Sequence, residues 1–266
     1  MRGRFRVPGW QDRGVSFKRY VALGDSTTEG LEDPNADGTY RGWADRLAEM
    51  LAAEEPDFGY ANLAIRGRKL PQIRAEQLEP ALALEPDLAS VLGGLNDILR
   101  PSVMLDDIGA DLDAIVGSLR DQGATVLMMT YPDPTAVISV AGSRIRERVT
   151  GFNDRIREVA RGRGGVLIDL DLDGVSNPRY WSPDRLHANA LGHERMAASA
   201  ANALGIDPGE GWDALLPMPQ PMSAPLRIVR DAAWAGRHLT PWMVRRIRGR
   251  SSGDGRDPKR PHLGPL

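Results

Sequence analysis

Five residues in four distant segments of the chain carry the chemical groups that acyl transfer requires. They are Ser26, Gly67, Asn96, Asp184 and His187. A serine hydroxyl becomes a strong nucleophile when a neighbouring base takes its proton, and imidazole titrates in the useful pH range. A carboxylate fixes the tautomer of that imidazole, and Asp184 precedes His187 by three residues. A glycine amide, the serine's own amide and a carboxamide can stabilise the oxyanion that forms on the acyl carbonyl.

The elements that must position these residues alternate along the chain between strands and helices. Short apolar runs typical of buried strands occur at Tyr20–Leu23, Phe58–Leu63, Leu88–Leu92, Thr125–Thr130 and Val166–Leu170. Helical periodicity follows each run, at Trp43–Ala53, Leu70–Leu84, Leu105–Leu119, Ser143–Ala160 and Leu191–Leu204. This alternation predicts a parallel sheet with helices on both faces. Because function gathers at the carboxyl ends of such strands, we expect the four segments to meet there.

The same segments resemble the four sequence blocks of the SGNH hydrolase family, also called GDSL-type esterases and lipases. The matching stretches, in order, are Gly24-Asp25-Ser26 with Gly30, then Gly67, then Gly94-Leu95-Asn96-Asp97, and last Asp184-Arg185-Leu186-His187. The resemblance covers about residues 19–205. It implies an α/β fold, a flavodoxin-like three-layer sandwich, for which we predict a five-stranded parallel sheet.

The resemblance implies a role for each residue. Ser26 is the expected nucleophile, His187 the general base and Asp184 the carboxylate that orients His187. The backbone amides of Ser26 and Gly67 and the side chain of Asn96 are the expected oxyanion hole. The implied reaction is the two-step hydrolysis of a small-molecule carboxylic ester through an acyl-serine, with no cofactor and no metal. The family also contains deacetylases of acetylated sugars and small metabolites, and a non-catalytic binding module that keeps the fold is a further alternative.

Several of these residues also have plainer structural interpretations. Ser26 could cap the helix that its loop leads into, and Gly67 could serve only a turn that needs positive φ. Asn96 and Asp97 could form turns through their own backbone. We expect Asp25 and Asp97 to support their loops rather than to react. The other histidines, His193, His238 and His262, lack a carboxylate at the spacing that His187 has.

Composition excludes several classes of site. The 266 residues contain no cysteine, which rules out disulfides, thiolate metal sites and a cysteine nucleophile. Asp169-Leu170-Asp171-Leu172-Asp173-Gly174 resembles the start of a calcium loop, but Tyr180 stands where the bidentate glutamate belongs, so we predict no metal site. Residues 21–225 hold 18 basic and 32 acidic side chains. An acidic body between basic ends argues against nucleic-acid binding.

The chain divides by composition into five parts. We predict a basic segment at 1–18, the hydrolase domain at 19–205, a proline-rich linker or strap at 206–225, an amphipathic helical extension at 226–248 and a disordered basic tail at 249–266. The extension could lie on anionic lipid, but we favour packing of its apolar side against the body. Neither a signal peptide nor a transmembrane run is recognisable, which predicts a cytoplasmic protein. No feature of the sequence indicates an oligomeric state.

Overall fold

The computed structural model describes residues 16–100, 102–137, 142–171, 176–220, 222–241, 244 and 249–266. A six-stranded sheet at its centre has the order β5-β4-β3-β1-β2-β6. The strands are β1 (Arg19–Gly24), β2 (Gly59–Asn62), β3 (Leu88–Leu92), β4 (Thr125–Met129), β5 (Val166–Ile168) and β6 (Arg260–Gly264). The first five are parallel, and β6 pairs antiparallel with β2.

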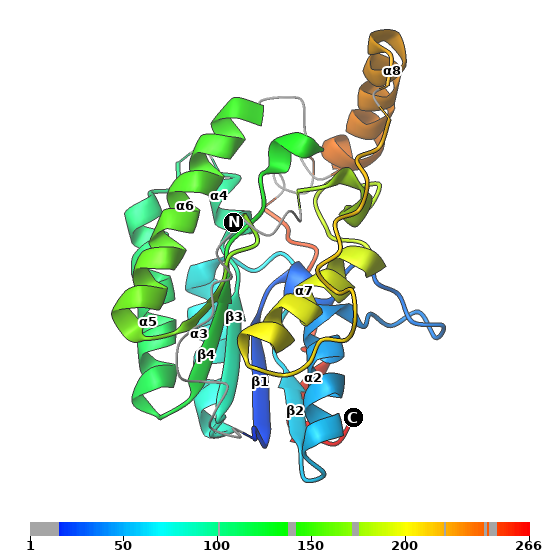
Figure 1. The fold of residues 1–266 in the computed structure, drawn as a ribbon. Helices are drawn as coiled ribbons and strands as arrows, with labels where there is room; N and C mark the ends of the chain where they lie inside the picture. Colours follow the sequence, from blue (N-terminus) through cyan, green and yellow to red (C-terminus); the bar gives the residue numbers. More distant parts are fainter. Residues whose placement is uncertain are drawn as a thin grey trace.

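Helices cover both faces of the sheet, as Figure 1 shows. On one face lie α2 (Gly42–Glu54) and α7 (Ala190–Ala203), which pack against each other. On the other lie α3 (Leu70–Ala83), α5 (Leu105–Asp121) and α6 (Gly142–Arg163). Strands β3 and β4 are buried along their whole length because helices cover them on both sides. The predicted three-layer α/β fold is confirmed.

The amphipathic patterns explain how these helices dock. In α5, Ile108, Leu112, Ile115 and Leu119 recur at helical spacing, and all four are buried. Two short helices follow strand ends: α1 (Ser26–Glu29) comes after β1, and α4 (Leu95–Ile98) comes after β3. Both therefore begin at the carboxyl edge of the sheet, where the predicted site residues lie.

The five predicted parallel strands are present, and β6 adds an antiparallel sixth strand at the edge of the sheet. The prediction of a disordered tail at 249–266 is wrong, because Arg260–Gly264 forms this strand. This segment has no alternating apolar pattern and contains Pro261, which has no N–H to donate and is tolerated at an edge. Distant contacts hold it instead. Lys259 forms an ion pair with Asp45, and the Arg260 guanidinium lies 5.5 Å from the centre of the Tyr60 ring.

The segment after α7 runs across the surface before the extension begins. Residues 206–220 contain no helix or strand, and the Asn177 side chain donates to the carbonyl of Leu216 at 2.8 Å. Helix α8 (Ala224–Trp234) follows and continues as a π-helical turn over Ala235–Leu239. The rest of the predicted extension, at 242–243 and 245–248, lies outside the described residues, as do residues 1–15.

Helix α8 extends away from the body, as Figure 1 shows, and none of its residues is buried. Leu226, Ile228 and Val229 are 56%, 68% and 65% exposed. The favoured expectation that the apolar side of the extension packs against the body is therefore wrong for these side chains. Among the described residues, no helix has the length and apolar character that crossing a membrane demands.

Candidate active site

Ser26 lies in the first turn of α1, directly after β1. The preceding residue, Asp25, is the N-cap of α1 and accepts a hydrogen bond from the Thr27 amide at 3.2 Å. The alternative that Ser26 caps this helix is therefore wrong. The Gln77 side chain holds the end of β1 from the other side, because it donates to the Gly24 carbonyl at 2.9 Å and accepts from the Gly24 amide at 2.8 Å. These contacts fix the backbone that carries the Ser26 hydroxyl.

The Ser26 hydroxyl and the His187 and Asp184 side chains form one chain of hydrogen bonds. His187 Nε2 is 2.8 Å from Ser26 Oγ, and His187 Nδ1 is 2.6 Å from Asp184 Oδ2. Since an ionised carboxylate only accepts, Nδ1 carries the proton and Nε2 is free to accept from the serine. This arrangement brings together three residues that are separated by up to 161 positions in the sequence.

A tight loop presents Asp184 and His187 to the serine. The Ser182 amide donates to the His187 carbonyl at 2.9 Å, which closes the loop. Asp184 Oδ1 accepts from the amides of Leu186 and His187 at 2.9 and 3.0 Å and from the Ser182 hydroxyl at 2.5 Å. Arg185 between them has φ of 60°, the left-handed conformation that lets the chain turn. The carboxylate is thus fixed by three donors besides the imidazole.

Asp184 and His187 shift each other's pKa in opposite directions. Burial alone would lower the pKa of His187, but the hydrogen bond and the charge of Asp184 raise it above its ordinary value. Burial alone would raise the pKa of Asp184, but the hydrogen bonds and charge of His187 together with the Ser182 hydroxyl hold it well below its usual range. Asp184 is therefore ionised at neutral pH, and its charge stabilises an imidazolium on His187.

The loop after β2 carries the Gly67 amide to the same edge of the sheet. Gly67 has φ of 76°, so a side chain there would strain the backbone. The preceding residue, Arg66, donates from its amide to Glu29 at 2.8 Å, and its guanidinium forms an ion pair with the same carboxylate. Because Glu29 belongs to α1, this pair ties the Gly67 loop to the helix that carries Ser26. Among the described residues, no protein acceptor is recorded for the Gly67 amide.

Asn96 is engaged by two partners in this structure. Its Nδ2 donates to Asp25 Oδ2 at 3.0 Å and to the Arg68 carbonyl at 3.1 Å. A carboxamide nitrogen has two protons, so both are already directed to protein acceptors. To donate to an oxyanion, Asn96 must share or exchange one of these bonds. Asn96 is thus bonded to the residue before the predicted nucleophile. Both acceptors are distant in the sequence, so the interpretation of Asn96 as a turn formed through its own backbone does not hold.

Asp25 and Asp97 are buried and support the surrounding loops. Burial raises the pKa of Asp25 to about 7, although the Thr27 amide, the charge of His187 and the Asn96 side chain oppose the rise. Burial likewise raises the pKa of Asp97 to about 6. Asp97 Oδ2 accepts from the Leu70 amide at 3.0 Å, which joins the start of α3 to the loop after β3.

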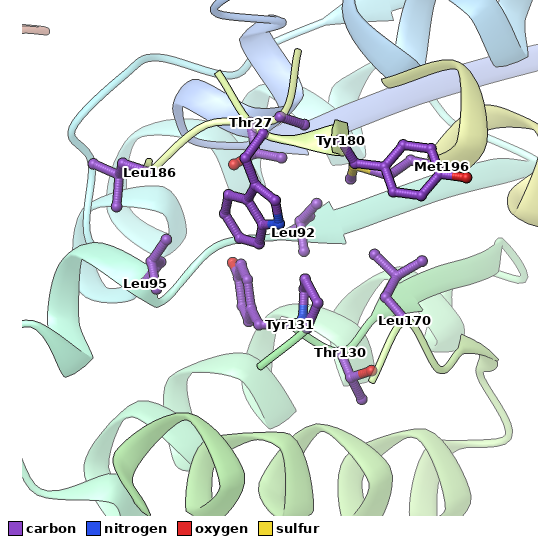
Figure 2. Close-up of a pocket in the computed structure, with 12 residues that line it drawn as sticks. Thr27, Leu92, Leu95, Thr130, Tyr131, Leu170, Tyr180, Leu186 and Met196 are labelled. Carbon is purple, nitrogen blue, oxygen red and sulfur yellow. The ribbon is translucent and has the colours of Figure 1, made fainter. Parts of the chain in front are cut away.

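An apolar pocket of about 50 Å³ opens beside these residues (Figure 2). Its lining includes the chain neighbours of three site residues: Thr27 follows Ser26, Leu95 precedes Asn96 and Leu186 precedes His187. The remaining lining residues are Leu92, Thr130, Tyr131, Pro132, Leu170, Tyr180, Trp181, Ala188 and Met196. In Figure 2, Leu95 and Leu186 lie toward one side of the pocket and Leu170 toward the other.

Other candidate residues have structural partners. His193 is fully buried, where Nδ1 accepts from the Trp43 amide at 3.1 Å and Nε2 donates to the Leu31 carbonyl at 2.9 Å. Burial lowers the pKa of His193 to about 4, so it is a neutral ring that joins α7 to α2. In the calcium-like stretch, Asp169 and Asp171 form ion pairs with Arg157, and residues 172–175 lie outside the described residues.

Sequence reasoning missed residues that act through their backbone or through contacts across the fold. The Arg68 carbonyl that holds Asn96 has no signal in the residue type. Ser182 could have been found, because Ser182-Pro183-Asp184 has the spacing at which a hydroxyl and a carboxylate bond within one turn. Trp181, the residue before Ser182, lines the pocket. Its place next to a predicted catalytic block could have marked it as a pocket residue.

Comparison with known proteins gives a family match and several relatives. The model of the GDSL-like Lipase/Acylhydrolase family matches residues 22–195. An acetylxylan esterase from Geobacillus stearothermophilus is 22% identical in an alignment of 213 residues, and the match covers 72% of this chain and 96% of that protein. LAE5, an α/β hydrolase enzyme from the metagenome of Lake Arreo in Spain, has a TM-score of 0.60 at 22% identity and covers 71% of this chain and 95% of its own. TesA has a TM-score of 0.59 at 21% identity, with 70% and 98% covered.

Proposed function

Because the chain belongs to the GDSL-like lipase/acylhydrolase family, as its four sequence blocks predict, we propose that it hydrolyses carboxylic esters through an acyl-serine. The observation that carries the proposal is the continuous hydrogen-bonded chain from Ser26 Oγ through His187 to Asp184, with distances of 2.8 and 2.6 Å. These distances lie within the range over which a base can take a proton from a nucleophile.

The reaction has two steps that use the same groups. His187 Nε2 takes the proton of Ser26 as its oxygen attacks the acyl carbonyl, and the imidazolium that forms is stabilised by ionised Asp184. The imidazolium then gives this proton to the departing alcohol oxygen, which leaves Ser26 acylated. In the second step His187 takes a proton from water as the water oxygen attacks the acyl carbonyl. His187 then returns this proton to the Ser26 oxygen, the bond between Ser26 and the acyl group breaks, and the carboxylic acid is released.

The proposed oxyanion hole consists of two backbone amides and one side chain. The Gly67 amide is supplied by a loop that Arg66 and Glu29 fix to α1, and the Ser26 amide stands at the start of that helix. Asn96 is the third donor, and we propose that the Nδ2 proton directed at Asp25 is shared with the substrate oxygen as negative charge develops there. Donors aimed at a developing charge usually make the largest single contribution to this kind of catalysis.

The pocket favours a short acyl group, and this supports deacetylation as the second candidate function. Its volume of about 50 Å³ suits a few heavy atoms, and its lining next to Ser26 and His187 is apolar. An acetyl methyl group fits such a space, whereas a long acyl chain needs more room than about 50 Å³. The acetylxylan esterase relative acts on an acetylated sugar polymer, as its name states, and is the same kind of ester hydrolase.

Labelling and turnover of the purified protein test this function together. Ser26→Ala should lower kcat on p-nitrophenyl acetate about 10⁶-fold and abolish labelling by a fluorophosphonate probe. Ser118→Ala, on α5, is the matched control and should leave both unchanged. Wild-type protein that neither turns over esters nor labels would favour the non-catalytic binding module. A panel of acetyl, butyryl and octanoyl esters with acetylated xylooligosaccharides then separates a general esterase from a deacetylase.

A further inference from the structure

The chain beyond the family match contacts both loops that hold the polar groups of the site. The match ends at residue 195, whereas α8 and the segment Ser251–Asp254 come later in the sequence. Helix α8 contacts the loop that carries Asp184, and Ser251–Asp254 contacts the loop that carries Gly67. The chain therefore supplies contacts to the candidate site from outside its matched domain.

The segment Ser251–Asp254 lies directly on the Gly67 loop. Gly253 is buried, and a methyl group added to it would overlap the Arg66 carbonyl and approach Ile65 at 2.9 Å. A methyl group added to Gly67 would overlap the Ser251 hydroxyl. The Gly253 amide donates to that hydroxyl at 3.2 Å, which fixes the hydroxyl against Gly67. The backbone on either side of the Gly67 amide thus has no room to shift toward the segment.

Two hydrogen bonds, both made by Arg68, connect this segment to Asn96. The Ser251 amide donates to Asp254 Oδ2 at 2.8 Å, so the segment closes on itself as a tight turn. Arg68 Nη1 donates to Asp254 Oδ1 at 3.4 Å, and the Arg68 carbonyl accepts from Asn96 Nδ2 at 3.1 Å. The same turn therefore borders two of the proposed oxyanion donors, one through Gly67 and the other through Arg68.

Helix α8 contacts the loop of Asp184 in a similar way. Trp234 Nε1 donates to the Asp184 carbonyl at 2.8 Å. Asp231 forms an ion pair with Arg185 at 2.7 Å, and the Arg185 guanidinium lies 5.0 Å from the centre of the Trp234 ring. Both charged side chains are largely buried, at 10% and 18% exposure. These contacts bind the side chain of Arg185, whose left-handed backbone lies between Asp184 and His187.

We propose that the chain beyond the family match is a positioning element of the active site, in which Gly253 and Ser251 set the position of the Gly67 amide and Trp234 sets the position of the Asp184 loop. The proposal rests on the proposed ester hydrolysis. Neither Gly253 nor Trp234 is expected to touch the substrate. They act through other residues, because a displacement of about 1 Å in a catalytic group can cost about 100-fold in rate.

A pair of glycine variants tests the contact with the Gly67 loop. Gly253→Ala should lower kcat about 10- to 100-fold with KM nearly unchanged, because the displaced amide acts on the transition state. Gly264→Ala is the matched control, since Gly264 lies in the same C-terminal segment with open space around it, and should leave kcat unchanged. If Gly253→Ala does not fold, Ser251→Ala replaces it, because it removes the hydroxyl and adds no atom. We expect this variant to lower kcat severalfold.

A pair of tryptophan variants tests the contact with the Asp184 loop. Trp234→Phe keeps a ring beside Arg185 but loses the donor to Asp184, and should lower kcat/KM about three- to tenfold. The acid limb of its pH profile should move to lower pH, because a looser Asp184 raises the pKa of His187 less. Trp212→Phe is the control, since the Trp212 ring also lies beside an arginine, 4.8 Å from the Arg195 guanidinium. A purely structural role would lower Tm and leave the acid limb in place.

The outcomes separate this proposal from the proposed function. Absence of ester turnover in the wild-type protein would refute the function itself. With wild-type turnover present, an unchanged kcat in the Gly253 variant and an unmoved acid limb in the Trp234 variant would overturn the positioning role alone. Reduced kcat at constant KM in the first variant and a shifted acid limb in the second would support it.

Discussion

Replacing Asp184 by asparagine changes the site by reversing one hydrogen bond. Three donors point at Asp184 Oδ1, namely the amides of Leu186 and His187 and the Ser182 hydroxyl. In Asp184→Asn the carboxamide oxygen must occupy this position, because the two backbone amides cannot accept. The new NH₂ group then replaces Oδ2, 2.6 Å from His187 Nδ1, and donates to it. His187 consequently carries its proton on Nε2, facing Ser26.

The expected loss follows from this tautomer. An imidazole with its proton on Nε2 cannot accept a proton from the Ser26 hydroxyl, and no carboxylate remains to stabilise the imidazolium. A change of this kind lowers kcat about 10⁴-fold, which corresponds to about 5.5 kcal/mol of transition-state stabilisation. The KM should change little, because the acyl and alcohol groups of the substrate do not contact Asp184 in the proposed mechanism.

The assay is steady-state hydrolysis of p-nitrophenyl acetate at about pH 8, where ordinary imidazole is neutral. Circular dichroism establishes that the variant is folded at the assay temperature. Asp169→Asn is the matched control, because its side chain is exposed to a similar extent, 20% against 18% for Asp184, but pairs with Arg157 and Thr130. A kcat for Asp184→Asn within tenfold of the wild-type value would refute the assigned role of Asp184.

Three further predictions use other parts of the structure. Asn96→Ala should lower kcat about 10²- to 10³-fold, and a change confined to KM would make Asn96 a binding residue instead. Because Asp184 raises the pKa of His187, kcat/KM should be maximal at alkaline pH and fall as the pH drops through a pKa above that of ordinary imidazole. A flat acid limb would exclude His187 as the base. Lys259→Met leaves Asp45 largely buried without its cation and should lower the free energy of unfolding by about 3 kcal/mol in urea titrations, whereas unchanged stability would show that the ion pair contributes nothing.

The central sheet could be predicted because its signals are local. The apolar run at Leu88–Leu92 coincides with β3, and the run at Thr125–Thr130 exceeds β4 by one residue. The parallel order then requires the segments after β1, β2 and β3 to meet at one edge, and there Asn96 donates to Asp25, the residue before Ser26. The pairing of Asp184 with His187 was also accessible, since both lie within one turn of chain.

The remaining features depend on contacts between distant parts of the chain. Lys259 donates to the carbonyls of Tyr40 and Arg41, more than two hundred residues earlier, and no local pattern predicts this. The two partners of Asn96 are equally hidden, because one is a backbone carbonyl. Helix α8 has the periodicity of a helix that packs on a core, yet only its contacts, at Asp231 and Trp234, reveal which residues reach the body.

The antiparallel strand at the sheet's margin has a practical consequence for anyone who shortens this protein. Trimming it after α7 would strip β6 from β2 and leave a row of main-chain N–H and C=O groups facing solvent. Such a margin is a template for pairing with another molecule, so the trimmed product should precipitate or self-associate. Affinity tags therefore belong at the opposite terminus, where they cannot disturb the last strand.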